Sequence, residues 1–123
     1  MRAILVIFIG GGLGSVLRYL VNRWVLTWFH LSFPLGTFLV NVLGCFLIGF
    51  FIFYINKSQP LPLRLFLVTG FCGGFTTFSS FAFENVELIE NQQIGVWLFY
   101  TLLSLILGFT FAWLGAIVGR NLF

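Results

Sequence analysis

Charged side chains are scarce in this chain. Of its 123 residues, 60% are hydrophobic, 7% are charged and only three are acidic, and the mean hydropathy is +1.10. A soluble domain needs a solvated surface, which so few charged residues cannot provide. This composition therefore excludes a soluble domain and predicts an integral membrane protein. At about 20 residues for each helical crossing of a bilayer, the length allows four helices with short connections and no additional soluble domain.

Residue types that carry catalysis or bind metals are also few. The one histidine, His30, lies outside the apolar segments, and there is no Ser/His/Asp set, metal-ligand set or P-loop. Cys45 and Cys72 lie within apolar segments without CxxC spacing, which favours small packing residues over a metal or redox site. We therefore expect no enzyme. The six basic residues are scattered along the chain, so they indicate membrane topology anchors and not a nucleic-acid surface.

The hydrophobic pattern predicts an all-α integral membrane protein in which residues 1–123 form a single four-helix domain. Pro34 suits the first turn of a second helix, and the polar segment NKSQPLP, residues 56–62, connects the second helix to the third. The start of the chain could pass for a signal peptide, but the apolar pattern continues past any cleavage point, so we expect a retained span. The predicted spans are about 3–29, 35–54, 63–90 and 95–119.

The segment GFCGGFTTFSSFAF, residues 70–83, is poorly suited to an unbroken helix facing lipid. Two adjacent glycines free the backbone, and four hydroxyl side chains follow them. In hydrocarbon every backbone polar group must be satisfied internally, so a break survives only if it is buried in protein or lines a polar path. We therefore predict that the third helix is broken at residues 73–77, and that this break is the functional site.

Polar residues recur at helical spacing in the second and fourth spans. Thr37 and Asn41 are four apart and share a face of the second span, and Tyr100 and Ser104 do the same in the fourth. An asparagine amide at the middle of a membrane requires a partner. Asn41 is therefore either a hydrogen-bonding group between helices or a donor that lines a pore.

The first span combines small residues with a basic one. Gly10 and Gly14 have the GxxxG spacing that allows close helix approach, and Gly115 and Gly119 repeat it in the fourth span. Arg18 either reaches the membrane interface as an anchor or lines a water-filled vestibule, where it would raise the local anion concentration.

The three acids, Glu84, Glu87 and Glu90, are three residues apart at the end of the third span. The favoured interpretation of this spacing is a solvated interfacial face. An acid within the membrane would instead favour a proton-coupled carrier.

Basic residues do not set one orientation clearly. With four spans both termini share a side, and either orientation is plausible, including both at once. The terminus side carries Arg2, Lys57, Arg64 and Arg120, against Arg18 and Arg23 on the other.

Because four short helices barely enclose a solvated route, we expect a homodimer. Opposite insertion of its subunits would place a two-fold axis in the membrane plane.

Three segments resemble the signature segments of the Fluc/CrcB fluoride channels. They are GGGLGSVLRY at residues 10–19, GTFLVNVLGCF at 36–46 and GFCGGFTTFSSF at 70–81. They cover the first three spans in order, and the fourth agrees in length and small-residue character. The resemblance implies an antiparallel, dual-topology homodimer in the cell membrane that exports cytoplasmic fluoride passively through two pores, which would reduce fluoride toxicity.

The resemblance also implies roles for individual residues. Phe78 and Phe81 would be the aromatic pair along each pore, and Asn41 the amide that coordinates the ion. Weaker expectations are a polar track along the pore and Arg18 in a vestibule. The backbone carbonyls of Gly73 and Thr76 from both subunits would hold a structural sodium ion. The expected track consists of Thr37, Ser79, Ser80, Tyr100 and Ser104.

Two other functions fit parts of the sequence. A small four-helix, proton-coupled multidrug exporter also can form a dual-topology dimer, but it needs an ionisable acid in the membrane. A scaffold subunit would explain the small-residue spacings, but it gives no reason for Asn41 or for the broken helix. The fluoride channel is therefore our prediction.

Overall fold

The computed structural model describes residues 1–55 and 59–122, and every regular element within them is a helix. The long helices are α1 (Arg2–Trp28), α2 (Leu35–Tyr54) and α6 (Ile94–Asn121). A fourth, interrupted helix runs from Leu61 to Glu90, so the described part of the chain holds four helices long and apolar enough to cross a membrane. The prediction of an all-α membrane protein with four apolar helices is confirmed. Lys57, used in the topology prediction, lies outside the described residues.

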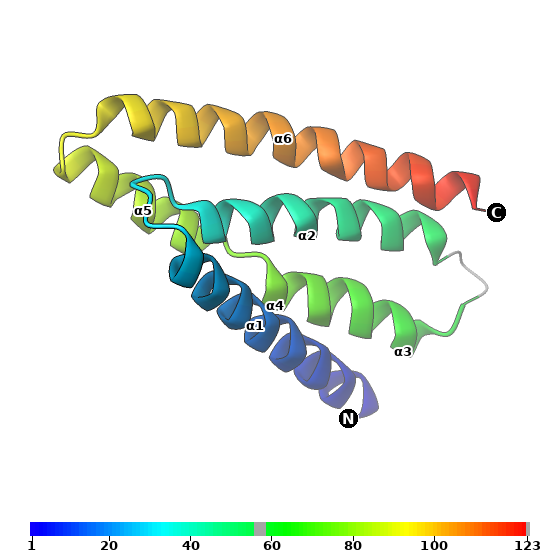
Figure 1. The fold of residues 1–123 in the computed structure, drawn as a ribbon. Coiled ribbons are helices and arrows are strands. Elements are labelled where there is room, and N and C mark those ends of the chain that lie inside the picture. Colours follow the sequence, from blue (N-terminus) through cyan, green and yellow to red (C-terminus); the bar gives the residue numbers. More distant parts are fainter. Residues whose placement is uncertain (56–58, 123) are drawn as a thin grey trace.

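The interrupted helix consists of four pieces. They are α3 (Leu61–Arg64), the wider π-type helix η1 (Leu65–Cys72), α4 (Gly73–Phe75) and α5 (Phe78–Glu90). Thr76 and Thr77 have extended backbone, with φ of −79° and −150°, and they separate α4 from α5. In Figure 1 this break bends the green ribbon between its two halves.

The break is therefore real, but its predicted bounds are partly wrong. Gly73 and Gly74 are helical, and only Thr76 and Thr77 leave the helix. Gly74 serves helix packing instead, because a Cβ there would overlap the carbonyl oxygen of Gly11 on α1. The Thr77 hydroxyl accepts a hydrogen bond from the Ser80 amide, 3.2 Å away, so it caps the N-terminus of α5 and stabilises the restart of the helix.

Small residues bring the helices together in two pairs, α1 with η1 and α4, and α2 with α6. On α1, Gly14 lies against the backbone of Phe71 and Phe75, where a side chain would clash. On α6, Gly115 lies equally close to the carbonyl of Phe46 on α2. The packing interpretation of both GxxxG spacings is confirmed.

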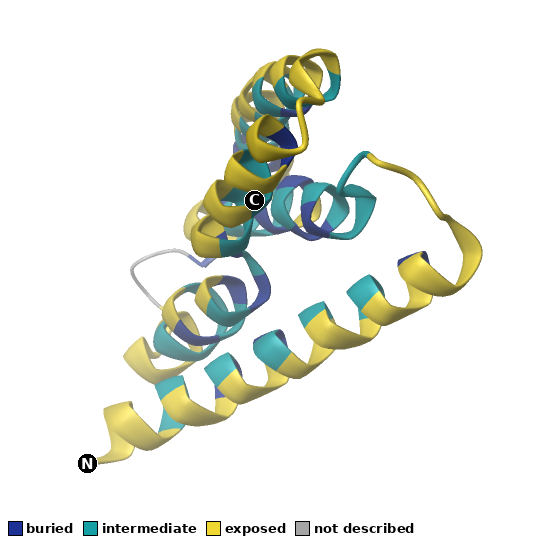
Figure 2. Ribbon diagram, turned by 90° about the vertical axis from the view of Figure 1, so that its left-hand side faces the viewer, coloured by how far each residue is buried: buried dark blue, intermediate teal, exposed yellow. Residues whose placement is uncertain are grey.

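The helices bury little of their apolar surface against one another. Figure 2 shows α1 as largely exposed, with a single stripe of half-buried and buried residues along one side. Bulky apolar side chains cover the outside, such as Phe8, Trp24 and Phe109, which are 76%, 59% and 77% exposed. Lipid or another protein subunit has to cover such a surface. Both termini lie at the same end of the bundle, and the turn between α5 and α6 lies at the other (Figure 1).

Candidate functional site

Asn41 binds both backbone groups of Thr77, the second residue of the extended segment. From α2 its Oδ1 accepts a hydrogen bond from the Thr77 amide at 2.7 Å, and its Nδ2 donates to the Thr77 carbonyl at 3.1 Å. The break removes the helical partner of the Thr77 amide, which is the Gly73 carbonyl, and Asn41 Oδ1 replaces it. The Thr77 carbonyl stands at the N-cap of α5, and Asn41 Nδ2 is a further donor to it. Asn41 is thus a hydrogen-bonding group between helices, and its second N–H remains a possible donor to an ion.

Hydroxyl groups cluster on the α5 side of the break. The Thr77 side chain lies 3.0 Å from the Ser80 Oγ, to which it donates, and 3.3 Å from the Ser79 Oγ. Thr77 is buried, Ser80 is half-buried and Ser79 is exposed. Sequence reasoning did not select Thr77, although a threonine directly before a helix restart is a familiar N-cap signal.

A cavity of about 320 Å³ lies beside the break, between α2 and α6. Its lining includes the rings of Phe78 and Phe81, whose centroids are 5.9 Å apart, and the side chains of Asn41 and Ser104. Among the residues that the structure describes, the Ser104 hydroxyl is a buried polar group with no hydrogen-bond partner. The cavity therefore combines unengaged donor capacity with two aromatic rings. Cys45 also lines it, which sequence reasoning did not anticipate.

Polar side chains of α1 reach the carbonyls that the break frees. Arg18 Nη1 donates to the Thr76 carbonyl at 3.2 Å, and Ser15 Oγ donates to the Gly74 carbonyl at 3.4 Å. The Gly73 carbonyl would accept from the Thr77 amide in a continuous helix, but that amide donates to Asn41. Arg18 is half-buried and lines neither of the two cavities described here. It brings a positive charge to the break.

Glu84 is not part of a solvated face, and the interfacial interpretation was wrong for it. Its carboxylate is half-buried and accepts hydrogen bonds from the hydroxyls of Thr37, at 2.6 Å, and Tyr100, at 2.8 Å. Glu87 and Glu90 are exposed, as expected. The error has a physical cause: the hydroxyl partners come from two other helices, and only the folded bundle brings them to Glu84.

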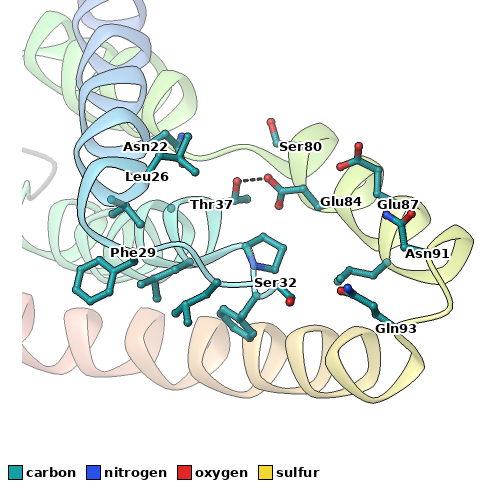
Figure 3. A pocket seen from close by; sticks show the side chains of 17 residues that line it. Asn22, Leu26, Phe29, Ser32, Thr37, Ser80, Glu84, Glu87, Asn91 and Gln93 are labelled. Carbon is teal, nitrogen blue, oxygen red and sulfur yellow. Dashed lines mark hydrogen bonds between the residues drawn. The ribbon is translucent and has the colours of Figure 1, made fainter.

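A second, larger cavity of about 540 Å³ lies at the end of the bundle away from the termini. Figure 3 shows Thr37 and Glu84 on its wall with their hydrogen bond, and Ser80, Glu87 and Asn91 beside them. Tyr100 is fully buried behind this wall, with its ring 5.2 Å from the ring of Phe81.

The predicted site residues therefore divide into groups. The smaller cavity gathers Asn41, Phe78, Phe81 and Ser104, and the larger one gathers Thr37 and Ser80. Tyr100 connects the two, since its hydroxyl contacts Glu84 and its ring contacts Phe81. Thr76 lines the smaller cavity. The other predicted residues, Arg18, Gly73, Ser79 and Tyr100, line neither cavity.

The smaller cavity suits a small anion chemically. Amide and hydroxyl donors can replace the water around such an ion, and the edge of an aromatic ring carries positive charge. No acidic side chain lines this cavity among the described residues. Its lining is mostly apolar, and its few polar groups gather at the helix break, which is where membrane proteins place ion paths.

Comparison with known proteins identifies the family. The family model described as CrcB-like protein, Camphor Resistance (CrcB), matches residues 5–116. The fluoride-specific ion channel FluC of Flavobacterium psychrophilum is 44% identical over 99% of this chain and 100% of its own length. FluC of Gloeothece citriformis is 48% identical over 94% of both chains, and FluC of Aquifex aeolicus is 40% identical over 99% of this chain and 100% of its own. With four apolar helices and a match along nearly its whole length, the chain belongs to the CrcB-like family of membrane proteins.

Proposed function

We propose that this chain is a fluoride-specific ion channel of the cell membrane, which exports cytoplasmic fluoride passively and so reduces fluoride toxicity. The observation that carries the proposal is the near full-length similarity to three fluoride-specific channels, at 40% to 48% identity. The chain matches them along all four helices. A channel is a transport protein, not an enzyme.

The smaller cavity is the proposed fluoride path. Fluoride is a small, strongly hydrated anion, so a selective path must bring donors close to it as water leaves. The second N–H of Asn41 and the unpartnered hydroxyl of Ser104 supply such donors. Phe78 and Phe81 would interact with the ion through their ring edges, whose positive charge attracts an anion.

Other polar residues extend this proposed path. Thr37, Ser80 and Tyr100 lead from the smaller cavity toward the larger one, and Ser79 lies on the exposed side of α5. Arg18 would act at longer range, because a half-buried guanidinium near the break raises the local concentration of anions.

A second copy of the chain would complete the site. Phe78 is 80% exposed beside the smaller cavity, and Ser79 and Gly73 are exposed nearby. Beyond its 3.3 Å contact with the Thr77 hydroxyl, the Ser79 hydroxyl has hydrogen-bonding capacity that hydrocarbon cannot meet, so a protein subunit is a better neighbour than lipid. We propose an antiparallel, dual-topology homodimer with two pores, and the small excess of basic residues on the terminus side leaves insertion in both orientations open.

A structural sodium ion fits the chemistry of the break. The proposed ligands are the backbone carbonyls of Gly73 and Thr76 of both subunits, and carbonyl oxygens suit hard cations. The Gly73 carbonyl has lost the Thr77 amide to Asn41, and the Thr76 carbonyl accepts Arg18 Nη1 with one of its two lone pairs. Sodium would supply positive charge for these carbonyls and hold the two breaks together.

Passive export is sufficient for this function. Fluoride enters from acidic surroundings as neutral HF and dissociates in the more alkaline cytoplasm, where it is trapped as an anion. An inside-negative potential favours anion exit by about 2.3 kcal/mol per charge per 100 mV. The drug-exporter alternative finds no support in the comparisons, and the one acid inside the bundle is engaged by two hydroxyls.

Fluoride release from proteoliposomes tests the proposal directly. Purified protein in vesicles should release fluoride rapidly and chloride slowly, as read with ion-selective electrodes. Phe81→Ile should release fluoride much more slowly, because an aliphatic side chain lacks the positive ring edge. Phe83→Ile is the matched control, since Phe83 is on the same helix, is 63% exposed and lines neither cavity. Well-folded wild-type protein that releases no fluoride would refute the proposed function.

A further inference from the structure

Glu84 holds an arrangement of donors that suits an anion. Each of its carboxylate oxygens accepts one hydroxyl, Oε1 from Thr37 at 2.6 Å and Oε2 from Tyr100 at 2.8 Å. These are short, charge-assisted hydrogen bonds. Both hydroxyls belong to the proposed fluoride path, yet both are engaged by a carboxylate of the chain itself.

The hydrogen bonds of Glu84 with Thr37 and Tyr100 are relevant to transport because of where these residues lie. Thr37 and Glu84 line the larger cavity (Figure 3). Tyr100 is fully buried, and its ring lies 5.2 Å from Phe81, which lines the smaller cavity. Glu84 and its two hydroxyls therefore lie between the two cavities, on the side where an ion that follows the proposed path would move from one to the other.

The charge of Glu84 is not balanced by a cation. Within residues 1–55 and 59–122, its partners are hydroxyls, and no basic side chain pairs with it. An unbalanced carboxylate repels a passing anion as long as it stays in place. The larger cavity offers it another position, because polar side chains such as Asn22, Ser32 and Gln93 line that cavity.

We propose that Glu84 is a tethered anion that occupies the hydroxyl site of Thr37 and Tyr100 between passages, and that fluoride passes by taking its place. The proposal rests on the proposed function. Fluoride is the strongest hydrogen-bond acceptor among the halides, so it competes with a carboxylate for hydroxyl donors, whereas chloride competes poorly. Glu84 is thereby a specificity-determining residue, which excludes anions too weak as acceptors to displace it.

Infrared spectroscopy can observe the displacement, because glutamates 84, 87 and 90 are the only acidic side chains in the chain. In the double variant Glu87→Gln/Glu90→Gln, the only side-chain carboxylate is that of Glu84. Titration of this variant with sodium fluoride should shift the carboxylate stretching band, whereas sodium chloride at equal concentration should not. A band that does not respond to fluoride overturns the proposal, as does an equal response to both salts.

Transport measurements provide the second readout. Glu84→Gln replaces the competing anion with a neutral amide, so the fluoride concentration for half-maximal efflux should fall several-fold and chloride release should rise several-fold. Glu90→Gln is the control, because Glu90 is exposed on the same helix and lines neither cavity. A slower Glu84→Gln channel with unchanged half-maximal concentration and unchanged chloride release would show a merely structural role.

The outcomes separate this inference from the proposed function. Wild-type protein that releases no fluoride refutes the function and the inference together. Wild-type protein that releases fluoride while the Glu84 band stays unchanged refutes the inference alone. If Glu84→Gln does not form a stable protein, the infrared titration still decides, because it leaves Glu84 in place.

Discussion

At the scale of single residues, polar side chains in this protein mainly hold other protein groups. Asn41 satisfies both backbone groups of Thr77, and Thr77 in turn caps α5. The amide of Asn41 therefore combines two tasks in this proposal, since one N–H supports the break and the second is assigned to the proposed path. Ser104 is the contrasting case, because its buried hydroxyl has no partner among the described residues.

This contrast predicts opposite effects on stability. Asn41→Leu leaves the Thr77 amide unpaired and removes one donor from the Thr77 carbonyl, which should lower the free energy of unfolding by roughly 1 to 3 kcal/mol. Ser104→Ala removes a hydroxyl that makes no hydrogen bond, so it should leave stability unchanged or raise it. Thermal unfolding of the detergent-solubilised variants measures both. An Asn41→Leu midpoint equal to that of the wild type would mean that water or lipid replaces the amide.

At the scale of elements, glycines determine how closely the helices approach. Gly14 and Gly74 face backbone atoms of the opposing helix, whereas a side chain at Gly12 on α1 would meet nothing within 4 Å. Helix α1 thus carries glycines that packing requires, among them Gly14, and also Gly12, which packing does not require.

Alanine substitutions at Gly14 and Gly12 test the difference between these two glycines. Gly14→Ala should separate α1 from η1 and α4 and destabilise the protein by about 1 to 3 kcal/mol or more, because the added methyl overlaps backbone that cannot move aside. Gly12→Ala should be tolerated. Melting temperature and the yield of folded protein from membranes measure the difference. Equal behaviour of the two variants would contradict the packing described for α1.

Sequence patterns predict those elements that depend on local information. Apolar runs predict the four helices, and GxxxG spacing predicts the packed faces around Gly14 and Gly115. The break is predicted only approximately, since its place depends on Asn41, which is 36 residues from Thr77. The partnership of Glu84 with Thr37 is not predictable from local pattern, because 47 residues separate them and only the fold brings them together.

At the scale of the whole molecule, the surface around the break is the main region that the chain's own helices leave uncovered. Phe78 and its polar neighbours face outward at the middle of an apolar helix. Basic residues near the membrane surfaces are few, and Arg120 at the end of α6 lies 4.1 Å from the centre of the Phe53 ring, which holds its charge near the surface. Such weak anchoring is consistent with the proposed insertion in both orientations.

Orientation can be measured with a tag at the C-terminus. In sealed vesicles, a membrane-impermeant reagent should label about half of the tags, and detergent should expose the remainder. Added lysines near the termini should bias the orientation. A variant biased in this way should lose fluoride efflux alone and regain it when it is produced together with an oppositely biased variant. Complete labelling of the unbiased protein before detergent would contradict the antiparallel dimer.

The contact between Arg18 and the Thr76 carbonyl has a consequence for biosynthesis. The two residues are 58 positions apart, and a ribosome needs roughly 3 to 12 seconds to add that length of chain. During this interval α1 is in the membrane with a charged side chain and a glycine face that its neighbour α2 does not cover. The first helix is therefore made before the segment that it packs against, and a chain that stalls after α2 should leave Arg18 and this glycine face without their protein partners.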